Sequence, residues 1–142
     1  MSSHFKKLEN MYLSAPFNGL FSPEISVKEG EAEITYEIKP DYFHAAFAVH
    51  GAVYFKAMDD AAFFAVNSMV EDVFVLTVSF TTYLTRPVSE GFMRATGRIV
   101  HQSRRLFLAE AVVVDDKGRQ IARGNGSFMR STMPLAPEIG YK

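Results

Sequence analysis

The sequence predicts an α+β fold in which an antiparallel β-sheet is wrapped around one long central helix. Residues 51–70 form an apolar segment with the length of a helix. The segments around it are rich in β-branched and aromatic residues, as strands are. The last four of these segments follow one another through short turns, which indicates an antiparallel sheet whose apolar face the helix covers.

The length and composition of the chain bound its organisation. Its 142 residues suit one domain with its own core, so we expect residues 1–142 to form a single domain. Residues 1–25 should form an N-terminal helix and loop extension, and residues 131–142 a loose tail. No repeat or linker divides the chain.

Charge and residue content exclude several classes of partner. The formal net charge of −1 provides no global field for nucleic acid or an anionic membrane, so we expect neither as a partner. The chain has no cysteine, which rules out disulfides, thiolate metal sites and a thiol nucleophile. The N-terminus lacks an apolar signal core, and charges interrupt the best apolar run, so we expect a cytoplasmic protein.

Two elements are expected before the long helix. Residues 3–13 can form a short helix with apolar side chains on one side. Pro16 and Pro23 mark a loop after it. Residues 31–38 alternate between apolar and polar side chains, which predicts a half-buried strand.

The long helix and four strands complete the expected order. The helix should run from about Gly51 to Val70. The strands are expected at residues 74–84, 91–101, 106–114 and 121–129, with an Asp/Gly-type hairpin turn at residues 115–118 before the last. Because such a sheet has open edges, we expect a homodimer that extends it, and two dimers could associate further into a homotetramer.

Two adjacent acids, Asp59 and Asp60, lie in the middle of the helix. Asp60 is one turn after Lys56, and an ion pair between residues four apart is a sufficient structural explanation for it. The helical neighbours of Asp59 are mostly apolar, and burying an ionised carboxylate is costly. Asp59 is therefore either bonded to a loop or a partner subunit, or it is a desolvated nucleophile or general base.

Gly51 begins the helix, where the first backbone N–H groups have no partner within the helix and carry partial positive charge. These groups could polarise an ester or thioester carbonyl, although Gly51 could equally serve only a tight turn. Eight residues of helix separate Gly51 from Asp59, a rise of about 12 Å, so one small reacting group cannot touch both. Two copies around a twofold axis can pair Gly51 of one subunit with Asp59 of the other.

These residues resemble a known family, the hotdog-fold acyl-CoA thioesterases of the phenylacetate-pathway (PaaI-like) type. The resemblance covers roughly residues 30–131. The first motif is a histidine, a glycine and a small residue at positions 50–52, with Asp59 nine residues after the histidine. The other two are the segment Thr77–Pro87, which ends in Arg-Pro, and the segment Gly97–Arg105. The resemblance implies a hotdog fold and hydrolysis of an acyl-CoA thioester to the free acid and coenzyme A.

The resemblance also implies roles for single residues. The Gly51 N–H would polarise the thioester carbonyl, and Asp59 of the partner subunit would be the nucleophile or the base that activates water. His44 stands where the family often has an asparagine that holds water or the thioester, although it could simply belong to an aromatic loop. Thr77 stands where a hydroxyl lies near the acid, although it could be an ordinary strand residue.

The substrate-binding positions include departures from the family pattern. Ala52 replaces a second glycine, and Ser103 replaces a glycine before a basic pair. Coenzyme A carries phosphates, which arginines could bind, although exposed arginines are often only solvated. The arginines in question are Arg86, Arg104 and Arg105. His50 is expected to cap or orient the loop. Aromatic side chains that could line an acyl pocket beside the helix are Phe43, Phe47, Tyr54, Phe55, Phe63 and Tyr83.

Three functions compete at this point. An acyl-CoA thioesterase needs water and a carboxylate, so we expect no cofactor and no metal, with coenzyme A only as part of the substrate. A hotdog dehydratase would use a histidine and an acid in a different motif. A non-catalytic acyl-CoA-binding protein, either a sensor or a structural protein, would have no need for an unpaired acid at position 59.

Overall fold

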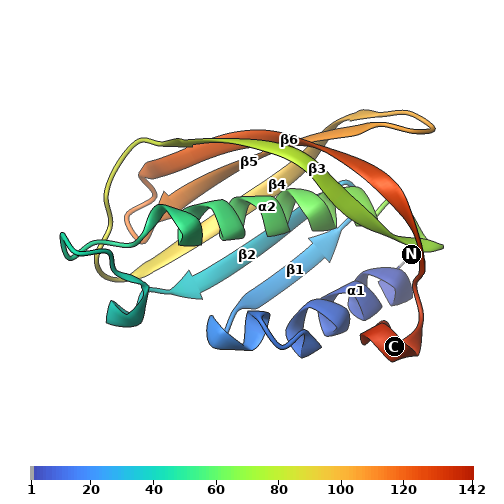
Figure 1. The fold of residues 1–142 in the computed structure, drawn as a ribbon, viewed down its shortest axis with the longest axis horizontal. Helices are drawn as coiled ribbons and strands as arrows, with labels where there is room; N and C mark the ends of the chain where they lie inside the picture. The colour runs from blue at the N-terminus through green and yellow to red at the C-terminus, as the bar shows by residue number, and fades with distance from the viewer. Residues whose placement is uncertain (1) are drawn as a thin grey trace.

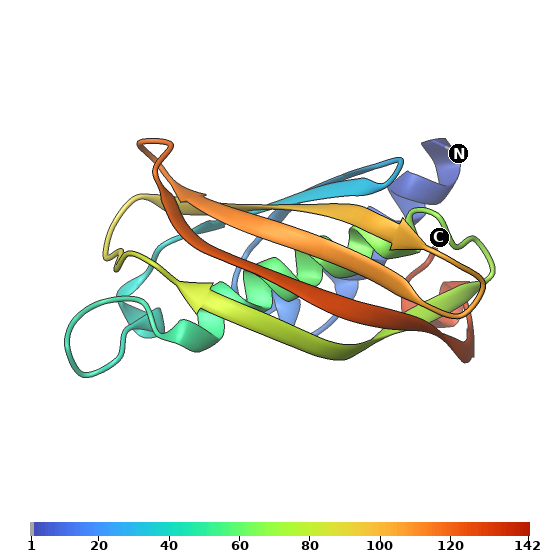
Figure 2. The same ribbon diagram turned by 90° about the horizontal axis from the view of Figure 1, so that it is seen from above.

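One antiparallel sheet curves over the helix α2 (Gly51–Asn67) in the computed structural model, which describes residues 2–142 (Figures 1 and 2). The order of its strands is β1-β2-β4-β5-β6-β3, with every neighbouring pair antiparallel. The strands are β1 (Glu24–Lys28), β2 (Glu31–Glu37), β3 (Val73–Leu84), β4 (Phe92–Gln102), β5 (Phe107–Asp115) and β6 (Gln120–Pro134). This architecture confirms the predicted fold class.

The terminal segments lie side by side, beside β1 in Figure 1. The helix α1 (Ser2–Ser14) agrees with the short helix predicted at residues 3–13, and the 3₁₀ turn η1 (Asn18–Leu20) follows it. At the other end of the chain, the 3₁₀ turn η3 (Pro137–Ile139) lies against α1. A further 3₁₀ turn, η2 (Pro40–Tyr42), precedes the loop that leads into α2.

Two parts of the fold differ from the sequence-based expectation. The strand β1 was not predicted, although its residues alternate between polar and apolar side chains, because it has only five residues and directly follows the loop marked by Pro16 and Pro23. Residues 131–142 are not a loose tail. The strand β6 continues to Pro134, and the last residues bond to α1, as in the bond from Asn10 Nδ2 to the Lys142 carbonyl (2.7 Å).

The helix α2 ends at Asn67, three residues before the predicted end. The Asn67 side chain is fully buried and donates to the carbonyls of Val70 and Val73 (both 3.1 Å). Its oxygen accepts from the Val75 N–H (3.1 Å). These bonds replace the next helical turn and fix the start of β3 to the end of α2.

Small residues allow the middle of the sheet to approach α2 closely. Ala57, Ala61 and Ala65 are almost fully buried on the helix. Gly97 of β4 packs on the backbone of Ala61 and Ala62, so a Cβ atom at position 97 would overlap them. The position of α2 under the sheet is therefore fixed by steric contact. None of the helices within residues 2–142 is long and apolar enough to cross a membrane.

Candidate active site

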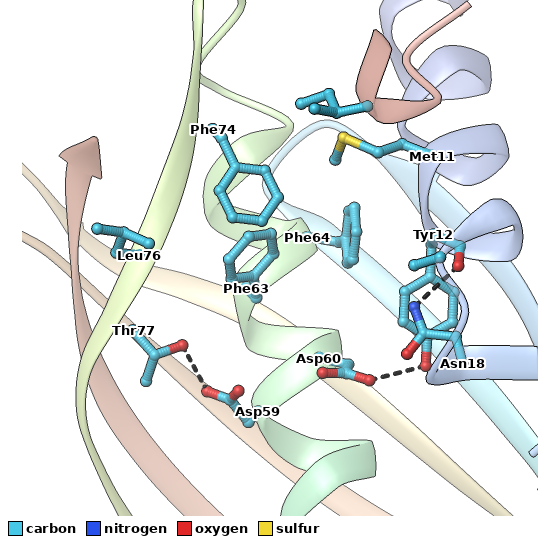
Figure 3. A pocket seen from close by; sticks show the side chains of 12 residues that line it. Met11, Tyr12, Asn18, Asp59, Asp60, Phe63, Phe64, Phe74, Leu76 and Thr77 are labelled. Atoms are coloured by element: carbon cyan, nitrogen blue, oxygen red, sulfur yellow. Dashed lines mark hydrogen bonds between the residues drawn. The ribbon is translucent and has the colours of Figure 1, made fainter. Parts of the chain in front are cut away.

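Asp59 and Thr77 meet at one end of a cavity of about 360 Å³ between α1, α2 and β3 (Figure 3). The Thr77 hydroxyl donates to Asp59 Oδ1 (2.8 Å). Thr77 faces the helix because β3 has an irregularity between Thr77 and Ser79, where its register with β6 shifts. The structure thus brings together two of the predicted catalytic residues.

The surroundings of Asp59 favour its protonated form. Burial raises the pKa of this carboxyl from 3.8 to about 6, and the charge of Asp60 adds to the rise. The Thr77 hydrogen bond and the Lys56 ammonium act in the opposite direction without cancelling the effect of burial. A carboxylate with this pKa is a stronger base than an exposed aspartate and is still ionised at neutral pH.

Asp60 has the opposite environment. Its Oδ2 accepts from Lys56 Nζ (2.6 Å), as the spacing predicted, and from the hydroxyls of Tyr12 (2.8 Å) and Tyr36 (3.4 Å). Burial and the Asp60 charge raise the pKa of both tyrosines above the usual range, so they remain hydrogen-bond donors. Lys56 also donates to Asn18 Oδ1 (2.6 Å). Through this oxygen, the Asp60 carboxylate belongs to a structural network of hydrogen bonds.

Gly51 lies in a second cleft of about 290 Å³, together with His44, Leu84 and Arg86. No group within residues 2–142 accepts a hydrogen bond from the Gly51 N–H. The next N–H, that of Ala52, donates to Nδ1 of His50 (2.9 Å), so the expected capping role of His50 is confirmed. Nδ1 of the exposed His44 accepts from the Ala46 N–H (3.0 Å). Gly51 and Asp59 open into separate spaces of one chain.

The remaining predicted binding residues are spread over the molecule. Ala52 lines a third cleft of about 360 Å³, which also contacts Asp59 and Phe55. Ser103, Arg104 and Arg105 form the exposed turn between β4 and β5. In Figure 1 this turn is at the opposite end of the molecule from the start of α2. Within one chain, these three residues are therefore not brought to Gly51.

Only one of the six aromatic candidates shares the cavity of Asp59 and Thr77. Phe63 lines it, whereas Tyr54 lies in the Gly51 cleft and Phe55 in the third cleft. Phe47 is 79% exposed and Tyr83 57% exposed. Phe43 is partly buried against the core. The other walls come from residues that the sequence did not single out for this role: Met11, Tyr12, Ala15, Asn18, Asp60, Phe64, Phe74, Leu76 and Ile139.

These wall residues lie on elements that are far apart in the chain. Phe63 and Phe64 follow Asp59 by about one turn of α2, so their presence could have been inferred from helical spacing. Met11 lies on α1, the helix predicted at residues 3–13, but no spacing rule connects that helix to Asp59. Ile139 belongs to the segment that was expected to be loose.

A sheet wrapped around a helix that carries a desolvated acid is the arrangement of a hotdog enzyme. The family model of the thioesterase superfamily matches residues 48–122, just over half of the chain, including Gly51, Asp59 and Thr77. The chain belongs to the thioesterase superfamily. It is therefore a thioester hydrolase by class.

Sequence relatives and solved structures agree with this assignment. A Mycobacterium tuberculosis protein with the name "Putative esterase Rv1847" is 29% identical over 119 residues, which cover 79% of this chain and 84% of the relative. The structure of the Escherichia coli PaaI protein from the phenylacetic acid degradation operon has a TM-score of 0.86 at 20% identity, covering 95% of this chain and 98% of that one. The structure of a mutant of the phenylacetic acid degradation protein PaaI from Thermus thermophilus has a TM-score of 0.75 at 24% identity, covering 82% of this chain and 100% of that one. These structural likenesses establish the hotdog fold.

Proposed function

We propose that the protein is an acyl-CoA thioesterase in which Asp59 of one subunit acts on a thioester whose carbonyl oxygen is bound by the Gly51 N–H of the partner subunit. The observation that carries this proposal is the contrast between two adjacent acids. Both acids line the cavity, but Asp60 Oδ2 is bonded to Lys56 and two tyrosines, whereas Asp59 has one hydroxyl donor and a raised pKa. A carboxylate held in this way is suited to nucleophilic or general-base catalysis.

The reaction needs a carboxylate near the carbonyl carbon of the thioester and a group with partial positive charge at the carbonyl oxygen. Asp59 either attacks the thioester carbonyl carbon itself or takes a proton from a water molecule that attacks it. In both routes negative charge develops on the carbonyl oxygen, and the free N–H at the start of α2 would stabilise it. In the base route the C–S bond then breaks and the proton on Asp59 passes to the sulfur, so that coenzyme A leaves as the thiol. In the nucleophilic route coenzyme A leaves as the thiolate, which takes a proton from water, and a water molecule hydrolyses the acyl–Asp59 anhydride to the free acid.

The separation of Gly51 from Asp59 supports a site shared between two subunits. About 12 Å of helix rise separates them, and they open into different spaces of one chain. A second copy beside α2 would bring one residue of each kind together. Arg86 lies in the Gly51 cleft, where its guanidinium could bind a phosphate of coenzyme A.

Release of free thiol from a panel of aromatic and aliphatic acyl-CoA esters tests the proposal. We expect turnover by the wild type and a loss of at least about a hundredfold in Asp59→Asn, because an essential base or nucleophile is removed. Asp116→Asn makes the same chemical change at an exposed turn position and should retain wild-type turnover. Tight binding of the esters with no turnover by the wild type would instead favour a non-catalytic acyl-CoA-binding protein.

A further inference from the structure

The cavity beside Asp59 has one polar end and one apolar end. Asp59 and Thr77 lie at the polar end, and the rings of Phe63, Phe64 and Phe74 line the middle, with Met11 beyond them in Figure 3. The centroid of the Phe63 ring is 5.0 Å from those of both Phe64 and Phe74. Asp60, Tyr12 and Asn18 also line the cavity near Asp59. Beyond these polar groups, a chain that starts at Asp59 and extends past the three rings meets mainly apolar side chains.

The far end of this cavity is built by the two terminal segments. Met11 of α1 and Ile139 of η3 both line it. Gly140, which has a left-handed backbone (φ 90°), packs so closely on α1 that a Cβ atom there would overlap Ser14 and come within 3.3 Å of the Met11 Cα. The C-terminal turn is thus seated directly on the helix that carries Met11.

Hydrogen bonds hold both segments in place. His4 Nε2 donates to the Asn67 carbonyl at the end of α2 (2.9 Å), and its Nδ1 accepts from the Tyr141 hydroxyl (2.7 Å). Tyr12, the neighbour of Met11, donates to Asp60. The far end of the cavity is therefore a fixed wall, and its distance from Asp59 limits the length of a group that the cavity can hold.

We propose that Met11 and Ile139 determine the substrate specificity of the enzyme by closing the far end of the pocket that receives an apolar acyl group. This inference rests on the proposed function, because it places the acyl group of the thioester on the Phe63 side of Asp59. The substrate class is then an acyl-CoA with an unbranched or aryl-ended apolar acyl group, whose length is limited by contact with these two side chains.

The test measures kcat/KM for saturated acyl-CoA esters of increasing length, with phenylacetyl-CoA included. In Ile139→Ala we expect the preferred chain to lengthen by at least about two carbons, with a gain of about fourfold for each further methylene that becomes buried. Ile139→Phe should lose the longest chains that the wild type accepts. Met11→Ala is a second enlarging variant from the other terminal segment, in case either change alone affects folding.

The matched control is Leu13→Ala on the same helix as Met11. Leu13 is 47% exposed and does not line the cavity, so its chain-length profile should equal that of the wild type. Thermal unfolding by circular dichroism checks that each variant is folded. An unchanged profile in folded Ile139→Ala and Met11→Ala would overturn the inference. A lengthened preference in Phe55→Ala alone would also overturn it, because it would place the acyl group in the third cleft.

A binding experiment separates this inference from the proposed function. The same esters are titrated by calorimetry into Asp59→Asn and into Asp59→Asn combined with Ile139→Ala, so that Kd is measured without turnover. If the wild type hydrolyses no ester, the proposed function fails. The chain-length dependence of Kd then still decides the inference, which requires longer chains to bind more tightly to the double variant.

Discussion

At the scale of single residues, the site depends on two neighbouring carboxylates in opposite surroundings. Asp60 has three donors on one oxygen, whereas Asp59 has the Thr77 hydroxyl and an apolar cavity. The structural alternative for Asp59 was a bond to a loop or to a partner subunit; within residues 2–142 its hydrogen-bond partner is Thr77 of strand β3. A carboxylate that is held against its own solvation weakens the fold, and under the proposed function it does so for the benefit of the reaction.

We predict that Asp59→Asn stabilises the protein at neutral pH. The pKa of Asp59 is about 6 in the folded protein, against 3.8 as the ordinary value, so its ionisation penalises the folded state as pH rises from about 4 to 6. Above pH 6 the full penalty is present, and the amide removes it. The expected gain at pH 7.5 is about 1–3 kcal/mol in the free energy of unfolding.

Urea unfolding of both proteins at pH 4.5 and pH 7.5 checks this prediction. The gain should shrink at pH 4.5, where the folded wild type already carries a proton on Asp59. The amide oxygen of asparagine can still accept from Thr77, so the hydrogen bond is not lost. Destabilisation at pH 7.5 would mean that Asp59 is a structural ion-pair partner.

Residue-scale predictions from the sequence succeeded where the partners are local. The Lys56–Asp60 pair and the His50 cap follow from spacings of four and two residues. The hydroxyls of Tyr12 and Tyr36 also reach Asp60, but their sequence separations of 48 and 24 residues carry no periodic signal. Long-range polar partners of this kind depend on how the elements pack.

At the scale of elements, Asn67 fixes β3 to α2 and so places Thr77 beside Asp59. We predict that Asn67→Ala lowers the free energy of unfolding by about 2–4 kcal/mol, because it leaves several buried backbone groups without partners. Activity should also fall, because the Asn67 bonds hold the start of β3, and the next residues of this strand, Phe74, Leu76 and Thr77, line the cavity. Urea unfolding and thiol release measure the two effects.

Asn125→Ala is the matched control, because Asn125 is exposed on β6. It should change the free energy of unfolding by less than about 0.5 kcal/mol, as surface substitutions usually do. Equal effects of the two alanine variants would show that the Asn67 bonds do not hold the two elements together.

The predicted elements were right where apolar periodicity is strong and incomplete where packing decides. Helix α2 and strands β2, β4 and β5 appear with small shifts at their ends. The strand β3 was expected to direct Leu76 and Val78 to the same face as Phe80. Register shifts on both sides of this segment instead bury Val75 and leave Leu76 50% and Val78 58% exposed. Such bulges have no signature in this sequence.

At the scale of the whole molecule, β3 is an edge strand with an apolar surface. It pairs with β6 on one side only, and Leu76, Val78, Tyr83 and Leu84 are all exposed on it. An edge of this kind favours pairing with another chain. The expected homodimer would use it, and the same contact would bring a second α2 alongside the first.

We predict that two inactive variants restore activity when they share a dimer. In a dimer of Asp59→Asn with Gly51→Val, one site carries both changes, and the other combines an intact Gly51 with an intact Asp59. Verified heterodimers should therefore have about half of the wild-type turnover, as expected for one functional site of two independent ones. Co-expression with two different affinity tags provides the heterodimer, and thiol release measures its activity.

Complete inactivity of the verified heterodimers would contradict a shared site. Recovery of activity in the heterodimer requires that Gly51→Val changes the structure only around position 51. A Cβ atom at Gly51 meets the end of the flexible Leu84 side chain at 2.9 Å, which can move away. Light scattering of each parent variant confirms that both still form dimers.

The termini of this chain have a consequence for how such an enzyme can diversify. The groups that would perform the chemistry lie within residues 48–122, whereas Met11 and Ile139 lie outside that range. Changes in the segments that carry Met11 and Ile139 would then alter which substrates are accepted without altering the hydrolytic centre. New specificities could therefore accumulate in the segments outside residues 48–122 while the residues inside that range stay under a separate constraint.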